Sequence, residues 1–154
     1  MPGPVPRLEH VCDLHVEVAT PLVVGETGLG ERRVIPITGG KVVGPRLNGT
    51  ILNAGADFQI IRENGLTILE AKYVLEVDGG GRVYIDNYGV RFGSPEAIDR
   101  LKRGLPVDPS QIYFRCTPKF ETSDESLRWL TQKIFIGTGI RRPTHVEIGV
   151  WQVD

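Results

Sequence analysis

The stretch that most constrains the fold of this chain runs from Arg32 to Arg62, and its short β-branched runs alternate with glycines: RRVIPITGGKVVGPRLNGTILNAGADFQIIR. Such runs, separated by glycine turns, are typical of closely spaced strands. The stretch also sets Arg46, Asp57 and Arg62 among apolar neighbours. Burying an isolated charge costs free energy. These groups must therefore pair with an opposite charge, contact water, or take part in binding or catalysis. We therefore expect a β-barrel that contains a polar pocket.

Length and composition limit the possible classes of protein. The 154 residues suit a single domain over 1–154. A net charge of −1 gives no general attraction to nucleic acid or anionic lipid. No apolar run approaches the ~20 residues that span a bilayer, and the N-terminal MPGPVPRLEHV lacks a secretory signal pattern. We expect a cytoplasmic protein with no nucleic-acid or membrane partner.

The sequence offers little for metal or cofactor chemistry. Cys12 and Cys116 lie in strand-like patterns without a CxxC spacing, which predicts free buried thiols. His10 and His15 have an odd separation, so a regular strand places them on opposite faces. They and His145 are expected at the surface. No GxGxxG, HExxH or phosphate-loop motif is present, so no metal and no cofactor is predicted.

Period-2 alternation predicts many strands. A first strand begins at Leu8, and its apolar residues are expected on one inner face: Leu8, Cys12, Leu14, Val16 and Val18. The glycine-rich Pro21–Gly30 reads as a loop. Gly39-Gly40 reads as a turn. Further short strands are expected over Arg32–Thr38, Lys41–Val43, Thr50–Leu52, Phe58–Arg62, Gln111–Thr117, Lys133–Ile136 and His145–Val153.

A long strand is expected over Leu66–Val77, because its odd-numbered residues are almost all apolar. Asn64-Gly65 before it suits a type I′ turn. The glycines of Asp78–Gly81 suit a hairpin turn into Arg82–Arg91. The even-numbered face of Leu66–Val77 is mixed, which fits either solvent or a wet lumen.

Two short helices are expected. Ser94, Pro95 and Glu96 supply an N-cap, an N1 proline and an early acid, and Gly104 can end the helix. A second is expected around Ser123–Leu130. The pattern as a whole predicts an all-β protein, an antiparallel β-barrel of about 8–10 strands with a lipocalin-like shape and one or two short helices.

Four motifs carry a family resemblance: GxRRVxPITGGxVxGPRLxGxxLxxGADFQ, LEAKYxLExDGGGRVYIxNxGxR, YFRCTPKFET and LRWLxxxIFIGTGxR. In order and spacing, from about Leu8 to Val153, the chain resembles the domain-of-unknown-function family 3237, also called uncharacterised protein family 0311. The resemblance implies a compact β-barrel, in a family whose members often have no assigned activity. Phe58 stands where the family pattern more often has an indole, which implies a reshaped pocket wall.

Asp57 and Glu70 are the candidate proton-transfer groups. Asp57 follows Ala54-Gly55-Ala56, whose small side chains leave room for a ligand, although an Asx turn would explain an aspartate here equally well. Glu70 lies in the middle of the long strand. If its face lines a lumen, burial can raise its pKa towards that of a general base; if the face is solvated, it is an ordinary surface acid.

Other polar groups can bind a substrate oxygen. The guanidinium groups of Arg46, Arg62 and Arg115 can hold a carbonyl or anionic oxygen or act as structural partners of the acids. Tyr113 shares a strand face with Arg115, about 7 Å away, and suits a phenolate or enolate. Asn87 faces apolar neighbours, and a buried amide needs a partner.

These considerations give two sets of candidate residues. The proposed catalytic residues are Asp57, Glu70, Arg62, Tyr113 and Arg115, and the proposed substrate-binding residues are Arg46, Phe58, Tyr73, Asn87, Arg91, Phe120 and Trp129. The doublets Arg32-Arg33 and Arg141-Arg142 read as solvated turn residues.

Three functions are compatible with this pattern. The first is a cofactor-independent enzyme that acts by acid/base proton transfer on a small carbonyl-containing, aromatic or polyketide-like compound, as an isomerase, cyclase or lyase of secondary metabolism. The second is a non-catalytic, lipocalin-like small-molecule-binding protein. The third is an assembly module, in which the edge strand Lys133–Ile136 pairs between subunits of a homodimer.

Overall fold

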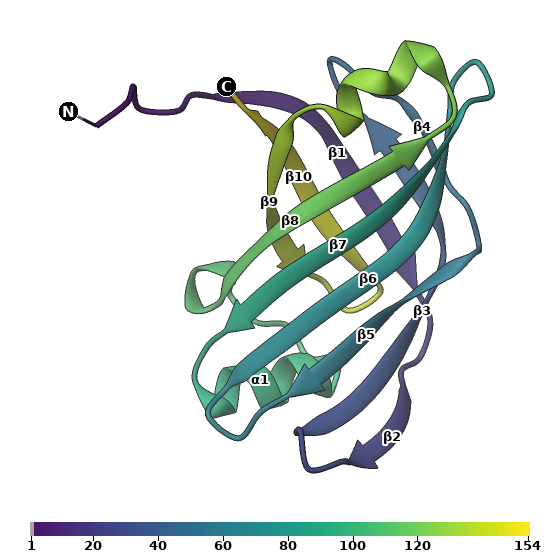
Figure 1. Ribbon diagram of the computed structural model, residues 1–154. Helices are drawn as coiled ribbons and strands as arrows, with labels where there is room; N and C mark the ends of the chain where they lie inside the picture. The colour runs from purple at the N-terminus through teal and green to yellow at the C-terminus, as the bar shows by residue number, and fades with distance from the viewer. Residues whose placement is uncertain (1) are drawn as a thin grey trace.

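The computed structural model describes residues 2–154 and is dominated by antiparallel strands (Figure 1). The elements are β1 (Leu8–Val18), β2 (Leu22–Glu26), β3 (Glu31–Val43), β4 (Gly49–Ile51), β5 (Gly55–Ile61), β6 (Leu66–Val77), β7 (Arg82–Phe92), α1 (Pro95–Lys102), η1 (Pro109–Gln111), β8 (Tyr113–Thr122), η2 (Glu125–Thr131), β9 (Ile134–Arg141) and β10 (His145–Val153).

The sheet closes on itself. Neighbouring strands run in the order β1, β10, β9, β8, β7, β6, β4 and β3, and β3 pairs again with β1. β4 and β5 both lie between β3 and β6 and so share one place in the barrel, whereas β2 pairs with β3 alone. The result is the closed eight-strand form of the predicted antiparallel barrel. Closure removes the open edges that make a sheet prone to further pairing.

Side-chain alternation decides what lies inside the barrel. On β6 the odd-numbered face is the interior one: Leu69, Tyr73 and Leu75 are buried, whereas Glu70 between them is exposed. Each fully buried aliphatic or aromatic side chain contributes roughly 1.5–3 kcal/mol of hydrophobic stabilisation. This fixes the register of each strand, since a shift by one residue would exchange the two faces.

A helix covers one end of the barrel. α1 lies at the bottom in Figure 1, and Ala97 N donates to the N-cap Ser94 Oγ over 3.1 Å. The helix buries Ile98 and Leu101. Its last turn is tied to the barrel wall, because Arg33 Nη2 donates to the carbonyl oxygen of Lys102 over 3.4 Å. The predicted helix after Ser94 is confirmed.

The second helical segment lies between β8 and β9 at the opposite, upper end (Figure 1). It was predicted around Ser123–Leu130, and it forms as the 3₁₀ segment η2. Its Leu130 is almost fully buried in the core, and Trp129 packs against the same core. η2 thus contributes to the closed upper end.

Three local predictions were wrong. Leu22–Glu26, expected within a loop, forms β2, an exposed strand whose apolar residues show no alternation because neither face is buried. Gly39-Gly40 does not turn: β3 continues through it with a bulge against β1. Asn64 does not adopt the positive φ of a type I′ turn, which in this hairpin is found at Gly65.

The first strand also contains an irregularity. A bulge between His10 and Cys12 puts both Val11 and Cys12 in the core. Leu8, predicted on the inner face, is exposed as a result. From Cys12 to Val18 the predicted alternation holds.

The segment proposed as an intersubunit edge lies within the sheet. Ile134–Ile136 pair with Trp151–Val153 of β10. On the other side of β9, pairing with β8 is confined to Gly137 and Thr138. A homodimer through this segment remains a proposal.

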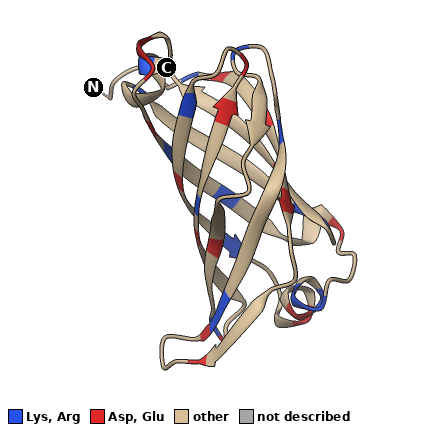
Figure 2. Cartoon of the chain, turned by 90° about the vertical axis from the view of Figure 1, so that its right-hand side faces the viewer, with Lys and Arg blue, Asp and Glu red and all other residues tan. Residues whose placement is uncertain are grey.

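Basic and acidic residues are interspersed along the strands (Figure 2). No helix among residues 2–154 is long and apolar enough to cross a membrane.

Candidate functional site

A cavity lies inside the barrel, towards the end that α1 covers. Its volume is about 40 Å³. One buried water needs roughly 10–15 Å³ on this measure, so the cavity has room for a few water molecules or a small ligand. Its polar lining residues are Asp57, Gln59, Tyr73, Asn87, Arg91 and Arg141. The remaining wall is largely aliphatic, with Phe114 as a further aromatic ring.

Strand register brings Asp57 and Asn87 into one row. Asp57 on β5 pairs with Ala71 on β6, and Ala71 pairs with Asn87 on β7. Adjacent strands are about 4.8 Å apart, so the backbones of Asp57 and Asn87 are about 10 Å apart across Ala71. The small methyl group of Ala71 leaves the space between the two polar side chains open.

Asp57 is an incompletely satisfied acid. Gln59 Nε2 donates to its Oδ2 over 2.9 Å. Its other oxygen, Oδ1, is buried without a hydrogen-bond partner among residues 2–154. Burial raises the pKa of Asp57. The Gln59 hydrogen bond, the charges of Arg91 and Arg141 and the nearby backbone N–H of Glu70 oppose that rise. A ligand atom with a proton to share would complete this site.

Arg91 is a buried cation beside this acid. Its side chain is 4% exposed, and its Nε has no hydrogen-bond partner among the described residues. The guanidinium carbon is 5.6 Å from the centre of the Phe114 ring. Burial lowers the pKa of Arg91 to about 10, with Asp57 acting in the opposite direction. The group therefore stays protonated at neutral pH.

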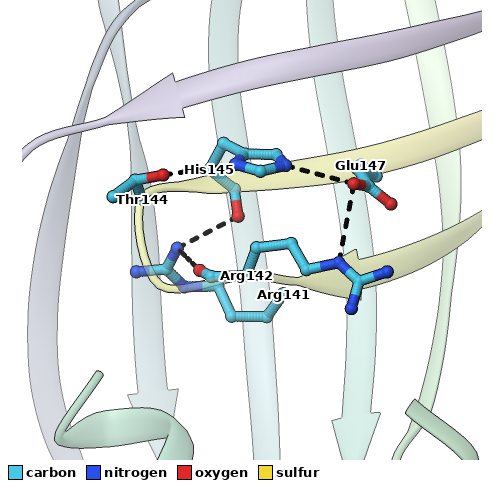
Figure 3. A network of polar contacts seen from close by, with 5 residues as sticks. All are labelled: Arg141, Arg142, Thr144, His145 and Glu147. Atoms are coloured by element: carbon cyan, nitrogen blue, oxygen red, sulfur yellow. Dashed lines mark hydrogen bonds and ion pairs between the residues drawn. The ribbon is translucent and has the colours of Figure 1, made fainter. Parts of the chain in front are cut away.

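Arg141 is held by the hairpin between β9 and β10 (Figure 3). Its Nη1 donates to the carbonyl oxygens of Arg142 and His145, the latter over 3.2 Å. Arg142 points the other way, with its Nε 3.5 Å from Glu147 Oε1. Burial lowers the pKa of Arg141, with Arg33 adding to that effect and Asp57 opposing it. The prediction that both arginines are solvated turn residues was thus wrong for Arg141. The same prediction for Arg32-Arg33 was wrong too, because both residues lie within β3 and Arg33 is buried on its inner face.

Tyr73 adds a neutral donor. Its side chain is 2% exposed and lines the cavity from β6. Burial raises the pKa of Tyr73, and the nearby thiols and Asp57 raise it further. The phenol therefore keeps its proton at physiological pH and can donate it in a hydrogen bond. Asn87, 6% exposed, brings an amide oxygen without a partner among residues 2–154.

Both cysteines are free and buried, as predicted. Cys116 lines the cavity, and burial raises the pKa of its thiol to about 11. Cys12 lies in the core, where burial raises its pKa to about 12. Since the thiolate is the nucleophile, neither side chain is activated. In the part of the chain from 2 to 154, no three His, Cys, Asp or Glu side chains are grouped to hold a metal ion.

Five predicted site residues do not reach the cavity. Glu70, Phe58 and Arg62 are exposed: the first two lie on the outer faces of β6 and β5, and Arg62 lies in the hairpin before β6. Tyr113 and Arg115 do share a face of β8, with the guanidinium carbon 5.4 Å from the phenol ring centre. That face is the outer one, because the apolar residues that alternate with them occupy the core.

Three further predicted residues lie at the opposite end of the barrel. The guanidinium carbon of Arg46 is 4.0 Å from the centre of the Trp129 ring, and Nη1 donates to Gln152 over 2.9 Å. Phe120 is buried and packs edge to face on Phe135 at 5.1 Å. None of the three lines the cavity, so they belong to the packing under η2.

Of the predicted site residues, Asp57, Tyr73, Asn87 and Arg91 line the cavity, and the prediction omits other polar groups of its wall. Gln59 and Arg141 line the same cavity, and Arg33, 5% exposed, is buried near them. The signal was available in the alternation: Arg33 shares a face with Ile35 and Ile37, and Gln59 with Asp57.

Comparison with known proteins extends these findings. The family model described as "Protein of unknown function (DUF3237)" matches residues 6–153. A UPF0311 protein of Rhodopseudomonas palustris is 47% identical over 150 residues, which cover 97% of this chain and 98% of that protein.

Solved structures share the fold. A β-barrel-like protein from Acinetobacter baumannii has a TM-score of 0.87 at 37% identity and covers 99% of both chains. A structure described as an enzyme from Penicillium herquei has a TM-score of 0.74 at 18% identity, with 100% of this chain and 98% of that chain covered; at that identity the likeness shows the fold alone. The family match and the relatives together establish that this chain belongs to the DUF3237 family, whose named relatives are UPF0311 proteins.

Proposed function

We propose that the cavity binds a small carbonyl compound and that Asp57 transfers a proton at the carbon next to the carbonyl group. The observation that carries this proposal is the unpartnered Oδ1 of Asp57 in a cavity that also holds Arg91, Arg141 and Tyr73. A desolvated carboxylate is a stronger base than one in water, and its raised pKa brings it closer to that of a useful general base.

The reaction begins when Asp57 takes the proton and leaves an enolate oxygen on the substrate. The buried guanidinium groups of Arg91 and Arg141 stabilise this oxygen by charge, and the Tyr73 hydroxyl can donate a hydrogen bond to it. Return of the proton to another carbon gives an isomerase. Loss of a leaving group gives a lyase, and attack of the enolate carbon on a second carbonyl group gives a cyclase.

The shape and lining of the cavity fit this range of substrates. Its walls are mostly aliphatic, with Phe114 available for an aromatic ring, which suits the apolar body of an aromatic or polyketide-like compound. None of the steps needs a group from outside the chain and the substrate. The description of a fungal protein of the same fold as an enzyme is in keeping with catalysis on this scaffold.

The test is the variant Asp57→Asn, compared with the wild type and with Glu70→Gln. Small ketones and keto esters are incubated with each protein in D₂O, and NMR follows deuterium entry next to the carbonyl. General-base catalysis contributes about 10²–10⁴-fold, so Asp57→Asn should lose at least about 100-fold in rate. The outer-face variant Glu70→Gln should match the wild type. Equal rates for wild type and Asp57→Asn would contradict the proposal.

A second candidate function is favoured by one observation: the cavity is largely apolar and lies beneath a helix that covers the barrel end. Small closed barrels can hold one ligand without transforming it. A carrier predicts that ligand affinity changes in Asp57→Asn while no compound shows solvent exchange above buffer with the wild type.

A further inference from the structure

The interior of the barrel near α1 carries an excess of positive charge. Arg91 and Arg141 line the cavity, and Arg33 is buried beside them. Asp57 is the one carboxylate among the lining residues of the described chain. Arg91 and Arg141 thus face a single acid in the cavity, in a region where charges are poorly screened. Arg33 adds a third buried guanidinium, whose own acidic neighbour is Glu31.

These cations are not satisfied within the protein. The Nε atoms of Arg33 and Arg91 are buried without hydrogen-bond partners among residues 2–154. Arg33 makes one long hydrogen bond, to the end of α1. Leaving buried charged donors unpaired costs several kcal/mol. Buried N–H donors without partners are expected where a bound ligand supplies the missing hydrogen-bond acceptor.

Arg141 is held in position before any ligand binds. Its Nη1 is anchored on two backbone carbonyl oxygens of the hairpin, so the direction of the side chain is fixed by the backbone (Figure 3). A guanidinium has five N–H donors in one plane. The remaining donors can form the paired hydrogen bonds that a carboxylate accepts.

We propose that the ligand of this cavity is a small organic carboxylate, whose charged group is bound by Arg91 and Arg141 and whose apolar body lies against the aliphatic wall. The carboxylate names the substrate class of the function proposed above. Its reaction rests on that proposed function, whereas its binding to the two arginines does not. A carboxylate is planar and singly charged, which suits a site that still holds Asp57. The apolar remainder of the cavity, lined by residues such as Ile35, Leu69 and Phe114, leaves no further charged partner for a polyanion.

The test measures binding of two acids and their neutral amides to the purified protein by calorimetry. The probes are benzoate with benzamide, and isobutyrate with isobutyramide. A charge-assisted hydrogen bond contributes about 1.5–3 kcal/mol, so each acid should bind at least about tenfold more tightly than its amide. Arg91→Gln and Arg141→Gln should each lose about tenfold or more in affinity for the acids.

Matched controls separate this site from general charge effects. Arg142→Gln removes the neighbouring guanidinium, which points away from Arg141 to Glu147, and it should bind the acids as the wild type does. Asp57→Asn should bind them at least as well as the wild type, since it removes the one negative charge near the carboxylate. If one arginine variant fails to fold, as judged by circular dichroism, the other supplies the test.

Each result bears on one proposal or the other. Equal affinity for acid and amide, unchanged affinity in both arginine variants, or no binding of either acid to the wild type would overturn the carboxylate site. Tight binding of the acids without solvent exchange in any substrate would leave this site standing and remove the proton-transfer function. Exchange of neutral ketones as fast as keto acids would keep the proton transfer and remove the carboxylate site.

Discussion

Gln59 Nε2 donates to Asp57 Oδ2 over 2.9 Å, and the two residues lie on the same inner face of β5. The contact leaves Asp57 Oδ1 and Gln59 Oε1 buried and without partners in the described chain. Gln59 therefore orients the acid and holds its pKa below the value that burial alone would give.

Replacement of Gln59 by leucine should make Asp57 harder to ionise. A hydrogen bond to a charged group contributes about 1.5–3 kcal/mol, so loss of the Gln59 hydrogen bond should raise the pKa of Asp57 further. The basic form would then appear at higher pH, and the pH profile of solvent exchange should shift in the same direction. Gln152→Leu is the control, because Gln152 is a buried glutamine at the opposite end, in contact with Arg46. An unshifted profile in Gln59→Leu would contradict this role.

Asp57 should lower the stability of the fold at neutral pH. Its pKa is raised in the folded state, so between its unfolded value near ~3.9 and its folded value the native protein binds more protons than the unfolded chain. Stability then falls as pH rises through this interval. Asp57→Asn removes the effect.

The measurement is urea unfolding of wild type and Asp57→Asn across a range of pH. The free energies of unfolding should coincide at acidic pH, where Asp57 is protonated in both states, and the variant should be the more stable at neutral pH. A variant that is less stable at neutral pH would show that ionised Asp57 is a structural ion-pair partner.

Glycine is required at position 40 because β3 passes close to the backbone of β1 there. Its φ is +141°, and an added Cβ would overlap the carbonyl oxygen of His15. Gly40→Ala should therefore lower the free energy of unfolding by about 3 kcal/mol or more, from backbone displacement and φ strain together.

Gly79 is the matched control for Gly40. Its φ is +99°, and an added Cβ would have no atom within 4 Å. Gly79→Ala should cost only about 1 kcal/mol, from φ strain alone. Equal losses for the two variants would mean that the contact with His15 is not restrictive.

The two thiols should be inert in the folded protein. Their pKa values are raised by burial to about 12 for Cys12 and about 11 for Cys116, so almost no thiolate is present at neutral pH. Disulfide reagents should modify neither thiol until the protein is unfolded. On raising the pH, mass spectrometry should find Cys116 alkylated first, because it lines the cavity. Rapid modification of Cys116 at neutral pH would contradict the burial that raises the pKa of its thiol.

The barrel was predictable because local signals agreed with one another. The alternation of Leu66–Val77, the glycines after Asp78 and the cap at Ser94 each specify an element that forms. β2 was missed because it is exposed, so no apolar alternation marks it. The bulge after His10 was missed because an extra residue in one strand depends on its partner strand.

The site was predictable only in part, for a related reason. Asp57, Tyr73, Asn87 and Arg91 were identified by polar or aromatic character on strands with apolar faces. The position of Glu70, in solvent or in a lumen, was left undecided. Alternation separates the two faces of a strand, but it does not say whether a face with mixed polarity contacts solvent or lines a lumen.

The prediction for Arg141 was wrong in a different way, because the residue was expected in solvent and lines the cavity. It stands beside Arg142 in the sequence, and a pair of charges suggests a solvated turn. Arg141 is the last residue of β9, and its side chain points away from that of Arg142 (Figure 3). Arg141 lines the cavity, whereas Arg142 does not. Neighbouring like charges at a strand end therefore need to be assigned separately.

The most direct test of this account is the titration of Asp57 itself. Carbon-13 NMR of protein labelled at the aspartate carboxyl carbon, with Asp57→Asn used to assign the signal, measures its pKa in the folded protein. The account predicts a pKa clearly above the usual value near ~3.9, and a further rise when benzoate is bound. A pKa at or below the usual value, unchanged by benzoate, would show that Asp57 is an ordinary solvated or ion-paired carboxylate and that the cavity lacks the acid on which the proposed chemistry depends.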